Sequence, residues 1–269
     1  MALVLLILVP VISFIVPGFF QGLGAASLPA EIVFVSTRND ADCIILGREE
    51  TAVIIDTGEK DDYPSIKLSL DSMGVKKIAL LVISHPDKDH IGSAVPLLED
   101  YRVDVIVIPF YTKENRHLPE LRASALEKRI PVIEPLKKRS FSAAGMRFLV
   151  FPANEKFYQK TNNYSLSVLA VDGKVNMLFT GDAEEKRLKE LMALVWPKID
   201  LLKIPHHGRD APSSRDFIRL INPEYALVTS DTCGKAVRDA CTEAGAEIFF
   251  SRPSGFKFSS NRKQVIPIQ

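Results

Sequence analysis

A short polar segment, SHPDKDHIGS at residues 84–93, holds two histidines and two aspartates within six positions. Neutral imidazole and carboxylate groups are the ligands that proteins offer to zinc, manganese or iron. A turn that follows a strand can point alternate residues at one centre, while adjacent residues reach a second. The segment therefore predicts a metal site, and its candidate ligands are His85, Asp87, Asp89 and His90.

Two later segments could complete the ligand shells. LFTGDAEE places Asp182 after a glycine at the end of an apolar run, where a carboxylate can bridge two cations. KIPHHG ends another apolar run with His206 and His207. Taken singly, such aspartates could instead cap helices, and a histidine pair could be structural. The concentration of four of the five histidines in two clusters favours a shared metal site and leaves His117 as a surface residue.

Short apolar runs that alternate with amphipathic stretches must position these clusters. Residues 31–37, 42–47 and 51–56 are rich in β-branched residues, which predicts three strands of an antiparallel sheet. A buried strand is expected at 77–84, directly before the first histidine. Further strands are expected at 103–109, 145–153, 165–173, 174–182, 199–208, 225–230, 246–251 and 255–260, and helices at 64–73, 93–101, 118–129, 183–195, 213–221 and 233–244.

Two strand-rich halves, each followed by helices, predict an α/β (α+β) sandwich of two sheets with helices outside. The polar clusters fall at strand ends, where functional residues of such folds collect. The dipeptide Asp172-Gly173 predicts a hairpin turn between two strands of the second half.

The composition is that of a globular protein with a sizeable core, because 46% of the 269 residues are hydrophobic and 25% are charged. The net charge of +1 excludes a protein that coats nucleic acid with a strongly basic face. The basic run at 137–139 is interpreted as a solvated edge. Three cysteines without a CxxC motif exclude a disulfide framework, although one bond between Cys233 and Cys241 is conceivable. Buried or idle thiols are the preferred interpretation.

The N-terminal segment is apolar, since residues 2–20 carry no charge and the first ionisable side chain is Glu31. A helix of that length would span about 28 Å, close to the hydrocarbon thickness of a bilayer. Small residues at Gly24 and Ala26 would suit signal-peptide cleavage, whereas the missing N-terminal Lys or Arg favours an anchor or the last helix of a longer membrane protein. We expect residues 1–26 to be a leader or anchor, and residues 27–269 to form a domain outside the cytoplasm.

Four segments occur in the order and spacing of the metallo-β-lactamase superfamily: IIDTG (residues 54–58), SHPDKDHIGS, LFTGDAE and KIPHHGRDAPSS. They resemble most the ComEC-like branch, the C-terminal domain of bacterial DNA-uptake proteins, whose pattern reads SHPDxDHIGG, NxxSL, LLTGD and HHG. The resemblance covers roughly residues 31–260. It implies an αββα sandwich of two mixed sheets with helices on the outer faces.

The resemblance also implies a site for two divalent metals, zinc or manganese. It assigns His85 and Asp87 to one metal, Asp89 and His90 to the other, and Asp182 to a bridge between them. Asp87 replaces the second histidine of the superfamily's HxHxDH pattern, as it does in the ComEC-like branch.

The remaining positions of the pattern leave alternatives open. TNNYSLSV stands where glyoxalase-like members have a further histidine, so one occupied metal site is the alternative to two. We expect His206 to be the ligand of its pair, and His207 to be a catalytic or substrate-contacting group. Asp56 is expected to fix the loop at its strand end without binding metal.

Two cations about 3.5–4 Å apart can lower the pKa of a shared water towards 7 and clamp the oxygens of an in-line displacement, which suits phosphodiester hydrolysis. Asp89 would orient the resulting hydroxide. Lys203, Arg209 and Ser213 are the candidate substrate contacts, with solvated charge and helix capping as alternatives. Four residues are candidate contacts for single-stranded DNA, with core packing of the tyrosines as the alternative. They are Tyr111, Lys113, Tyr158 and Lys160.

The resemblance implies a nuclease that degrades one strand of incoming DNA. Its expected partners are DNA, the membrane through the N-terminal segment, and a membrane DNA-uptake channel. One alternative is another metal-dependent hydrolase, such as a teichoic-acid phosphocholine esterase acting on the cell wall. The other is an inactive domain that guides DNA or serves as a scaffold.

Overall fold

The computed structural model describes residues 28–268. The expected leader, residues 1–26, lies outside that range. Within the described residues, no helix is both long and apolar enough to cross a membrane. All observations below concern the described residues.

The first sheet has nine strands, in the order β16-β15-β1-β2-β3-β4-β6-β7, with β5 beside β4. As predicted, the first three strands are antiparallel neighbours, and β4 then joins β3 in parallel. The strands are β1 (Ala30–Phe34), β2 (Ile44–Arg48), β3 (Thr51–Ile55), β4 (Lys77–Val82), β5 (Arg102–Val103), β6 (Ile106–Val107), β7 (Val132–Ile133), β15 (Phe256–Ser260) and β16 (Val265–Ile268).

The second sheet has seven strands, in the order β14-β13-β12-β11-β10-β9-β8. Strands β8 to β11 are antiparallel and β11 to β14 are parallel. The predicted hairpin is present, since Asp172 pairs with Val175 across the turn. The strands are β8 (Arg139–Ala143), β9 (Met146–Phe151), β10 (Ser167–Asp172), β11 (Val175–Phe179), β12 (Leu201–Lys203), β13 (Tyr225–Val228) and β14 (Glu247–Phe250).

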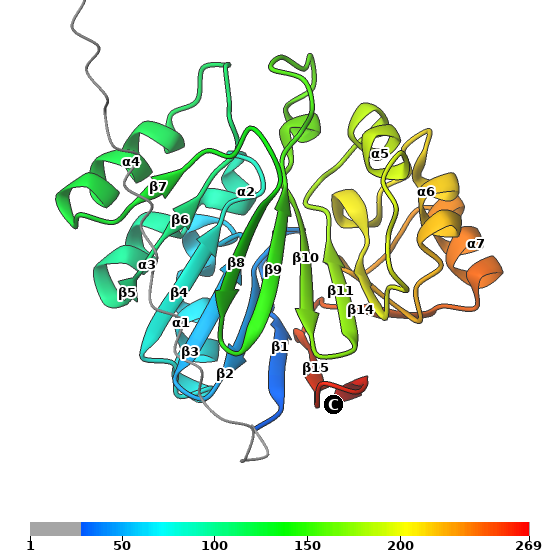
Figure 1. Ribbon diagram of the computed structural model, residues 1–269, viewed down its shortest axis with the longest axis horizontal. Coiled ribbons are helices and arrows are strands. Elements are labelled where there is room, and N and C mark those ends of the chain that lie inside the picture. The colour runs from blue at the N-terminus through cyan, green and yellow to red at the C-terminus, as the bar shows by residue number, and fades with distance from the viewer. Residues whose placement is uncertain (1–27, 269) are drawn as a thin grey trace, which may run out of the picture.

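Helices cover the outer face of each sheet, which confirms the predicted αββα sandwich (Figure 1). Helices α1, α3 and α4 pack on the first sheet, and α5 to α7 pack on the second. The helices are η1 (Lys60–Asp62), α1 (Tyr63–Ser72), α2 (Lys88–Ile91), α3 (Ala94–Asp100), α4 (His117–Glu127), η2 (Thr161–Tyr164), α5 (Glu185–Met192), η3 (Pro205–Gly208), α6 (Ser214–Ile221) and α7 (Lys235–Ala244).

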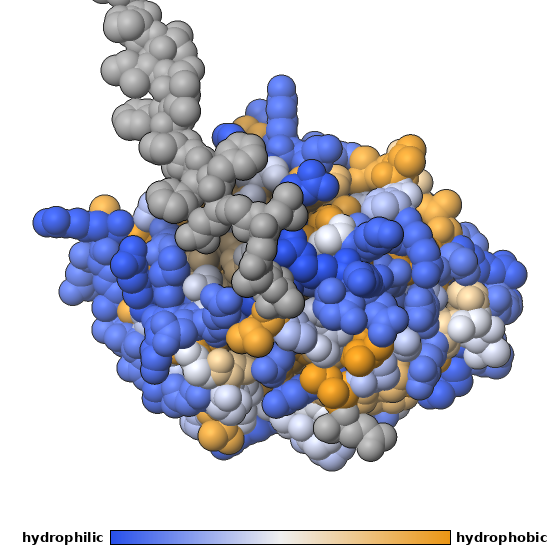
Figure 2. Space-filling view, turned by 60° about the horizontal axis from the view of Figure 1, so that its bottom comes forward, coloured by the Kyte–Doolittle hydropathy of each residue, from blue (hydrophilic) through white to orange (hydrophobic). Residues whose placement is uncertain are grey.

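Three apolar clusters hold the layers together. The middle cluster lies between the sheets and contains Phe34, Phe148, Phe179 and Phe258. The other two lie between each sheet and its helices. Central strands such as β2 are buried along their whole length because both faces of the sheet are covered, which explains their continuous apolar runs. On the face in Figure 2, hydrophobic residues form small separate spots among hydrophilic ones.

A buried ion pair joins the two sheets at the end where β10 turns into β11. Arg48 of β2 lies with Nη2 2.7 Å from Asp172 Oδ2. Its Nε donates to the Leu28 carbonyl at 2.9 Å, and its Nη1 donates to the Ala144 carbonyl at 3.0 Å. Ser260 of β15 donates to the same carboxylate at 2.7 Å. This ion pair and its hydrogen bonds therefore connect strands of both sheets through one guanidinium and one carboxylate.

Several strand predictions were incomplete. The strand expected at 103–109 is divided into β5 and β6, and the short strands β7, β8 and β16 were not predicted. All three lie at sheet edges, where β7 has only two residues, β8 is largely polar and β16 contains a proline, so each gives a weak strand pattern. The basic run at 137–139 is exposed at the start of β8, as a solvated edge should be.

The cysteines are free, so the conceivable bond between Cys233 and Cys241 does not form. Burial raises the pKa of Cys241 to about 12 and the pKa of Cys43 well above its ordinary value. Because the thiolate is the reactive form, we expect iodoacetamide at pH 8 to label only the half-buried Cys233 in the native chain. Mass spectrometry before and after denaturation would measure this, and fast labelling of two thiols in the native chain would contradict it.

Candidate metal centre

Three strand ends bring the polar segments together. Strand β4 leads into His85, β11 leads into Asp182, and β12 leads into His207. Parallel strands present their carboxyl ends on one side of a sheet, which is where α/β folds bind ligands. Both sheets therefore contribute side chains to one site, as the sequence predicted.

Four side chains converge there, with ligand atoms that all lie within 4.8 Å of one another: Asp89, His90, Asp182 and His207. Asp182 Oδ2 lies 3.0 Å from His207 Nε2 and 3.3 Å from His90 Nε2. Asp89 Oδ2 lies 3.6 Å and 3.9 Å from the same two nitrogens. We refer to these four residues as the ligand cluster.

His90 is held with its Nε2 facing the ligand cluster. Its Nδ1 donates to Asp56 Oδ2 at 2.9 Å. Asp56 is itself fixed because the Ser84 backbone N–H and the Ser84 hydroxyl both donate to it, each at 2.6 Å. A carboxylate on one ring nitrogen fixes the tautomer that leaves the other nitrogen free for a metal. Asp56 thus positions His90 and also binds the backbone of the loop at Ser84.

His207 is positioned in the same way by a residue that sequence reasoning missed. Its Nδ1 lies 3.1 Å from Thr229 Oγ1 and 3.2 Å from Asp42 Oδ1. Asp42 is fully buried, and its backbone N–H donates to the Asp89 carbonyl at 3.0 Å. The sequence did contain a signal for this role. Asp42 is a charged residue between Ala41 and Cys43, at the start of an apolar strand.

The donor set fits a divalent metal ion. The Nε2 atoms of His85, His90 and His207 are buried without a hydrogen-bond partner among the described residues. Burial opposes protonation of His207, but Asp182 and Asp42 outweigh it and raise its pKa to about 10. Burial likewise opposes ionisation of Asp89, but the neighbouring His207 and His90 lower its pKa to about 2. The negative potential that these shifts report would favour a cation at the cluster.

Lys203 does not have the surface position predicted for a substrate contact. It has no exposed surface, because β12 lies inside the sheet with both faces covered. Its Nζ pairs with Asp42, donates to the Gly181 carbonyl at 3.0 Å and lies 3.5 Å from Asp182 Oδ1. Lys203 therefore balances the charge of the carboxylates and leaves Oδ2 of Asp182 facing the histidines.

The structure reverses the expected order of the histidine pair. His207 enters the ligand cluster, whereas His206 turns towards Glu184, with Nδ1 3.6 Å from Oε1. Both histidines have left-handed backbone, with φ of 49° and 52°. Gly208 follows at φ 81°, where a β-carbon would lie 2.8 Å from Val228. This tight turn determines which histidine faces the ligand cluster. The alternation of side chains along a strand does not predict that choice.

His85 and Asp87 lie beside the cluster as a separate pair. His85 Nε2 is 3.6 Å from Asp87 Oδ2, and the His85 and His90 rings are 4.1 Å apart between centroids. Thr161 donates to Asp87 Oδ2 at 3.2 Å. Asp87 makes no capping hydrogen bond to α2, and Asp182 is not the N-cap of α5, so neither acts as the helix cap considered from the sequence.

The other predicted residues surround this site or support it. Arg209 is exposed, with Nη1 3.4 Å from His206 Nε2. Ser213 is buried at the N-cap position of α6, but its side chain makes no capping hydrogen bond. Asn162 lies with Nδ2 3.1 Å from Glu184 Oε1. Tyr158 is fully buried, so core packing explains it, whereas Lys160 is exposed and contacts Glu184.

Alanine substitutions of the two adjacent histidines should give opposite results. We expect His207→Ala to lose bound metal, because it removes an inward Nε2 of the ligand cluster. His206→Ala should keep its metal, since that ring contacts Glu184 instead. Elemental analysis of the two purified chains makes the comparison. Retained metal in His207→Ala together with loss in His206→Ala would restore the original assignment.

Comparisons with known proteins agree with this geometry. The family model described as "Metallo-beta-lactamase superfamily" matches residues 36–229. ComE operon protein 3 of Bacillus subtilis is 30% identical over 164 residues, which cover 60% of this chain and 21% of that protein. Recombination protein 2 of Haemophilus influenzae is 26% identical over 150 residues, which cover 56% of this chain and 17% of that protein. Competence protein ComA of Neisseria gonorrhoeae is 27% identical over 166 residues, covering 60% and 21%.

These three relatives are ComEC-type competence proteins, which confirms the resemblance stated from the motifs. The chain spans only about a fifth of their length. Among solved structures, the metallo-beta-lactamase fold protein YhfI from Bacillus subtilis has a TM-score of 0.60 at 11% identity, covering 86% of this chain and 100% of that one. CmlA from Streptomyces venezuelae, a diiron beta-hydroxylase, has a TM-score of 0.55 at 11% identity, covering 91% and 55%. At this identity the two structures show the fold alone.

Proposed function

The chain belongs to the metallo-beta-lactamase superfamily, and on that premise we propose that it is a metal-dependent phosphodiesterase that cleaves DNA during uptake. The observation that carries the proposal is the convergence of partnerless imidazole nitrogens and carboxylates at the ligand cluster. The ComEC-type relatives support DNA as the substrate.

The ligand cluster would hold a divalent cation through Asp89, His90, Asp182 and His207. A bound cation supplies a Lewis acid that lowers the pKa of water and polarises a phosphoryl oxygen. Asp89 is the most exposed of the four residues, at 29% of its side chain, and its low pKa keeps it ionised. Its carboxylate is therefore placed to accept a hydrogen bond from a water molecule that enters from solvent, and so to orient that water.

A second cation, bound more weakly, would have His85 and Asp87 as its ligands. The described residues contain no group of three converging ligands that includes this pair. Lys203 also lies beside Oδ1 of Asp182, which leaves one oxygen of that carboxylate for the histidines. These contacts favour one firmly held cation, zinc or manganese, with the second held less tightly.

Exposed cations near the cluster could contact the DNA backbone. Arg209 is 59% exposed beside His206, and Lys160 is 68% exposed beside Glu184. Arg and Lys contacts to phosphates provide affinity without reading sequence. The apolar segment at residues 2–20 supports a position outside the cytoplasm, either secreted or anchored, beside a membrane DNA-uptake channel.

The test uses the full chain purified without chelator. Bound metal is measured by elemental analysis, and cleavage of single-stranded DNA is measured with added manganese or zinc. The matched control is the His85→Ala, Asp182→Ala double variant. Metal-dependent cleavage by the unsubstituted chain alone is the expected result. Bound metal with hydrolysis of a phosphocholine ester but not of DNA would overturn the substrate, and neither metal nor cleavage would overturn the enzyme.

A further inference from the structure

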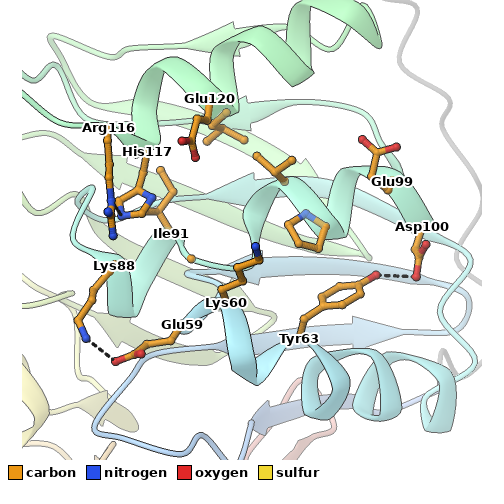
Figure 3. Close-up of a pocket in the computed structure, with 14 residues that line it drawn as sticks. Glu59, Lys60, Tyr63, Lys88, Ile91, Glu99, Asp100, Arg116, His117 and Glu120 are labelled. Atoms are coloured by element: carbon orange, nitrogen blue, oxygen red, sulfur yellow. Dashed lines mark hydrogen bonds and ion pairs between the residues drawn. The ribbon is translucent and has the colours of Figure 1, made fainter.

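A pocket of about 810 Å³ lies beside the ligand cluster, on the other side of α2. Asp89 and His90 of this short helix belong to the cluster, whereas Lys88 and Ile91 line the pocket. The remaining walls come from η1, α1, α3 and the start of α4 (Figure 3). Pockets of roughly 300–1,000 Å³ accommodate small organic ligands.

The charges around this pocket are unevenly distributed. Figure 3 shows Lys88, Arg116 and His117 on one side, together with Glu59 and Glu120, whereas Glu99 and Asp100 lie on the opposite side and Lys60 lies between the two sides. Lys88 pairs with Glu59, with Nζ 3.1 Å from Oε1. The described residues place no carboxylate within ion-pairing distance of Lys60 or Arg116. Lys60 and Arg116 therefore line the pocket as two cations that have no carboxylate partner among the described residues.

The acidic side is already neutralised in part. Tyr63 donates its hydroxyl proton to Asp100 at 2.7 Å, and Lys128 pairs with Glu99 at 2.9 Å. Both carboxylates keep oxygens that can accept further hydrogen bonds. This side of the pocket therefore suits neutral N–H or O–H donors of a ligand rather than a positively charged group.

The wall between the two charged sides is apolar. It consists of Ile91, Val95, Pro96, Leu121 and the ring of Tyr63. A ligand that matched the whole pocket would have an anionic end, a flat apolar body and hydrogen-bond donors at its far end. Aromatic and apolar side chains bind nucleobases by stacking and packing.

We propose that this pocket binds a nucleoside monophosphate. Its phosphate lies between Lys60 and Arg116, its base packs on the apolar wall, and its amino or hydroxyl groups donate to Glu99 or Asp100. The inference rests on the proposed function, because hydrolysis of the terminal phosphodiester bond of a DNA strand would release such a nucleotide next to the pocket. The pocket would then hold the released nucleotide or the nucleotide that flanks the cleaved bond.

Backbone contacts tie the pocket to the ligand cluster. A β-carbon on Gly92 would lie 2.6 Å from the Lys60 nitrogen and from the Lys88 carbonyl oxygen, so α2 and η1 are in direct contact. The Thr57 nitrogen also donates to the His90 carbonyl at 2.6 Å. The backbones of Lys60 and Lys88 are thus fixed relative to His90, and a nucleotide in the pocket would lie beside the metal centre.

The experiment measures binding of deoxyadenosine monophosphate to the full chain by calorimetry. Chelator is present throughout, so that no bound cation can attract the phosphate. Inorganic phosphate, deoxyadenosine and phosphocholine are compared under the same conditions. The test variant is Lys60→Ala, Arg116→Ala, and the matched control is Lys76→Ala, an exposed lysine at the opposite end of β4. Melting temperatures check that each variant is folded.

We expect deoxyadenosine monophosphate to bind more tightly than either of its parts or phosphocholine. The double variant should weaken that binding about tenfold or more, because it removes two charged partners, and Lys76→Ala should leave it unchanged. Equal binding by inorganic phosphate, tighter binding by phosphocholine, or undiminished binding by the double variant would each overturn the inference. Nucleotide binding without DNA cleavage would overturn only the proposed function, and cleavage without nucleotide binding would overturn only the pocket.

Discussion

A chain carrying Asp182→Asn is expected to lose its bound divalent metal and more than about 100-fold of its hydrolytic rate, since even outer residues of metal sites cost 10–100-fold when replaced. Asp182 Oδ2 lies within 3.3 Å of the free nitrogens of both His90 and His207. A neutral amide removes the negative charge that these imidazoles and a cation share. Elemental analysis and the rate of DNA cleavage measure the two effects.

The matched control for this substitution is Asp216→Asn, which changes an exposed aspartate in the first turn of α6. It should keep both metal and rate. If Asp182→Asn kept its metal at the level of the control, the ligand cluster would not be the principal metal site.

Replacing Arg48 by Met should lower the free energy of unfolding by about 3–5 kcal/mol, the usual cost of breaking a buried ion pair from one side. Asp172 has no exposed surface and would keep only the Ser260 hydroxyl and the more distant Arg262, whose Nε lies 3.8 Å from its Oδ1. The Leu28 and Ala144 carbonyls would lose their donor as well. Urea unfolding followed by circular dichroism measures the change.

Two further variants distinguish the effect of breaking the buried ion pair from the general effect of removing an arginine. Arg102→Met removes an exposed partner of Asp104 and should cost less than about 1 kcal/mol. Arg48→Met combined with Asp172→Leu should recover part of the loss, because no charge is then left buried alone. A single Arg48→Met variant as stable as Arg102→Met would show that the pair does not hold the sheets together.

The arrangement of layers could be predicted from the sequence for a physical reason. Apolar β-branched runs, such as residues 51–56 and 77–84, have to be buried, and polar residues that follow them are left at strand ends. The convergence of Asp89, His90 and Asp182 follows from that rule. The rule does not identify an edge strand such as β8. One side of this strand has no partner strand, and its residues are largely polar.

The details of the metal centre depend on contacts that are distant in the sequence. Asp42 acquires its role from Lys203 and His207, which lie more than a hundred residues later. The inward turn of His207 depends on left-handed backbone that Gly208 and its neighbours permit. Neither the spacing of the histidines nor their hydrophobic surroundings carries that information.

The pairing of β1 between β2 and β15 has a consequence for the order in which the chain is made. The ribosome adds residues 256–260, the second partner of residues 30–34, more than two hundred residues after them. His207 likewise appears after His90 by more than a hundred residues. During translation, the nascent chain therefore has an incomplete ligand cluster until His207 is added, and β1 lacks its second partner until residues 256–260 are added.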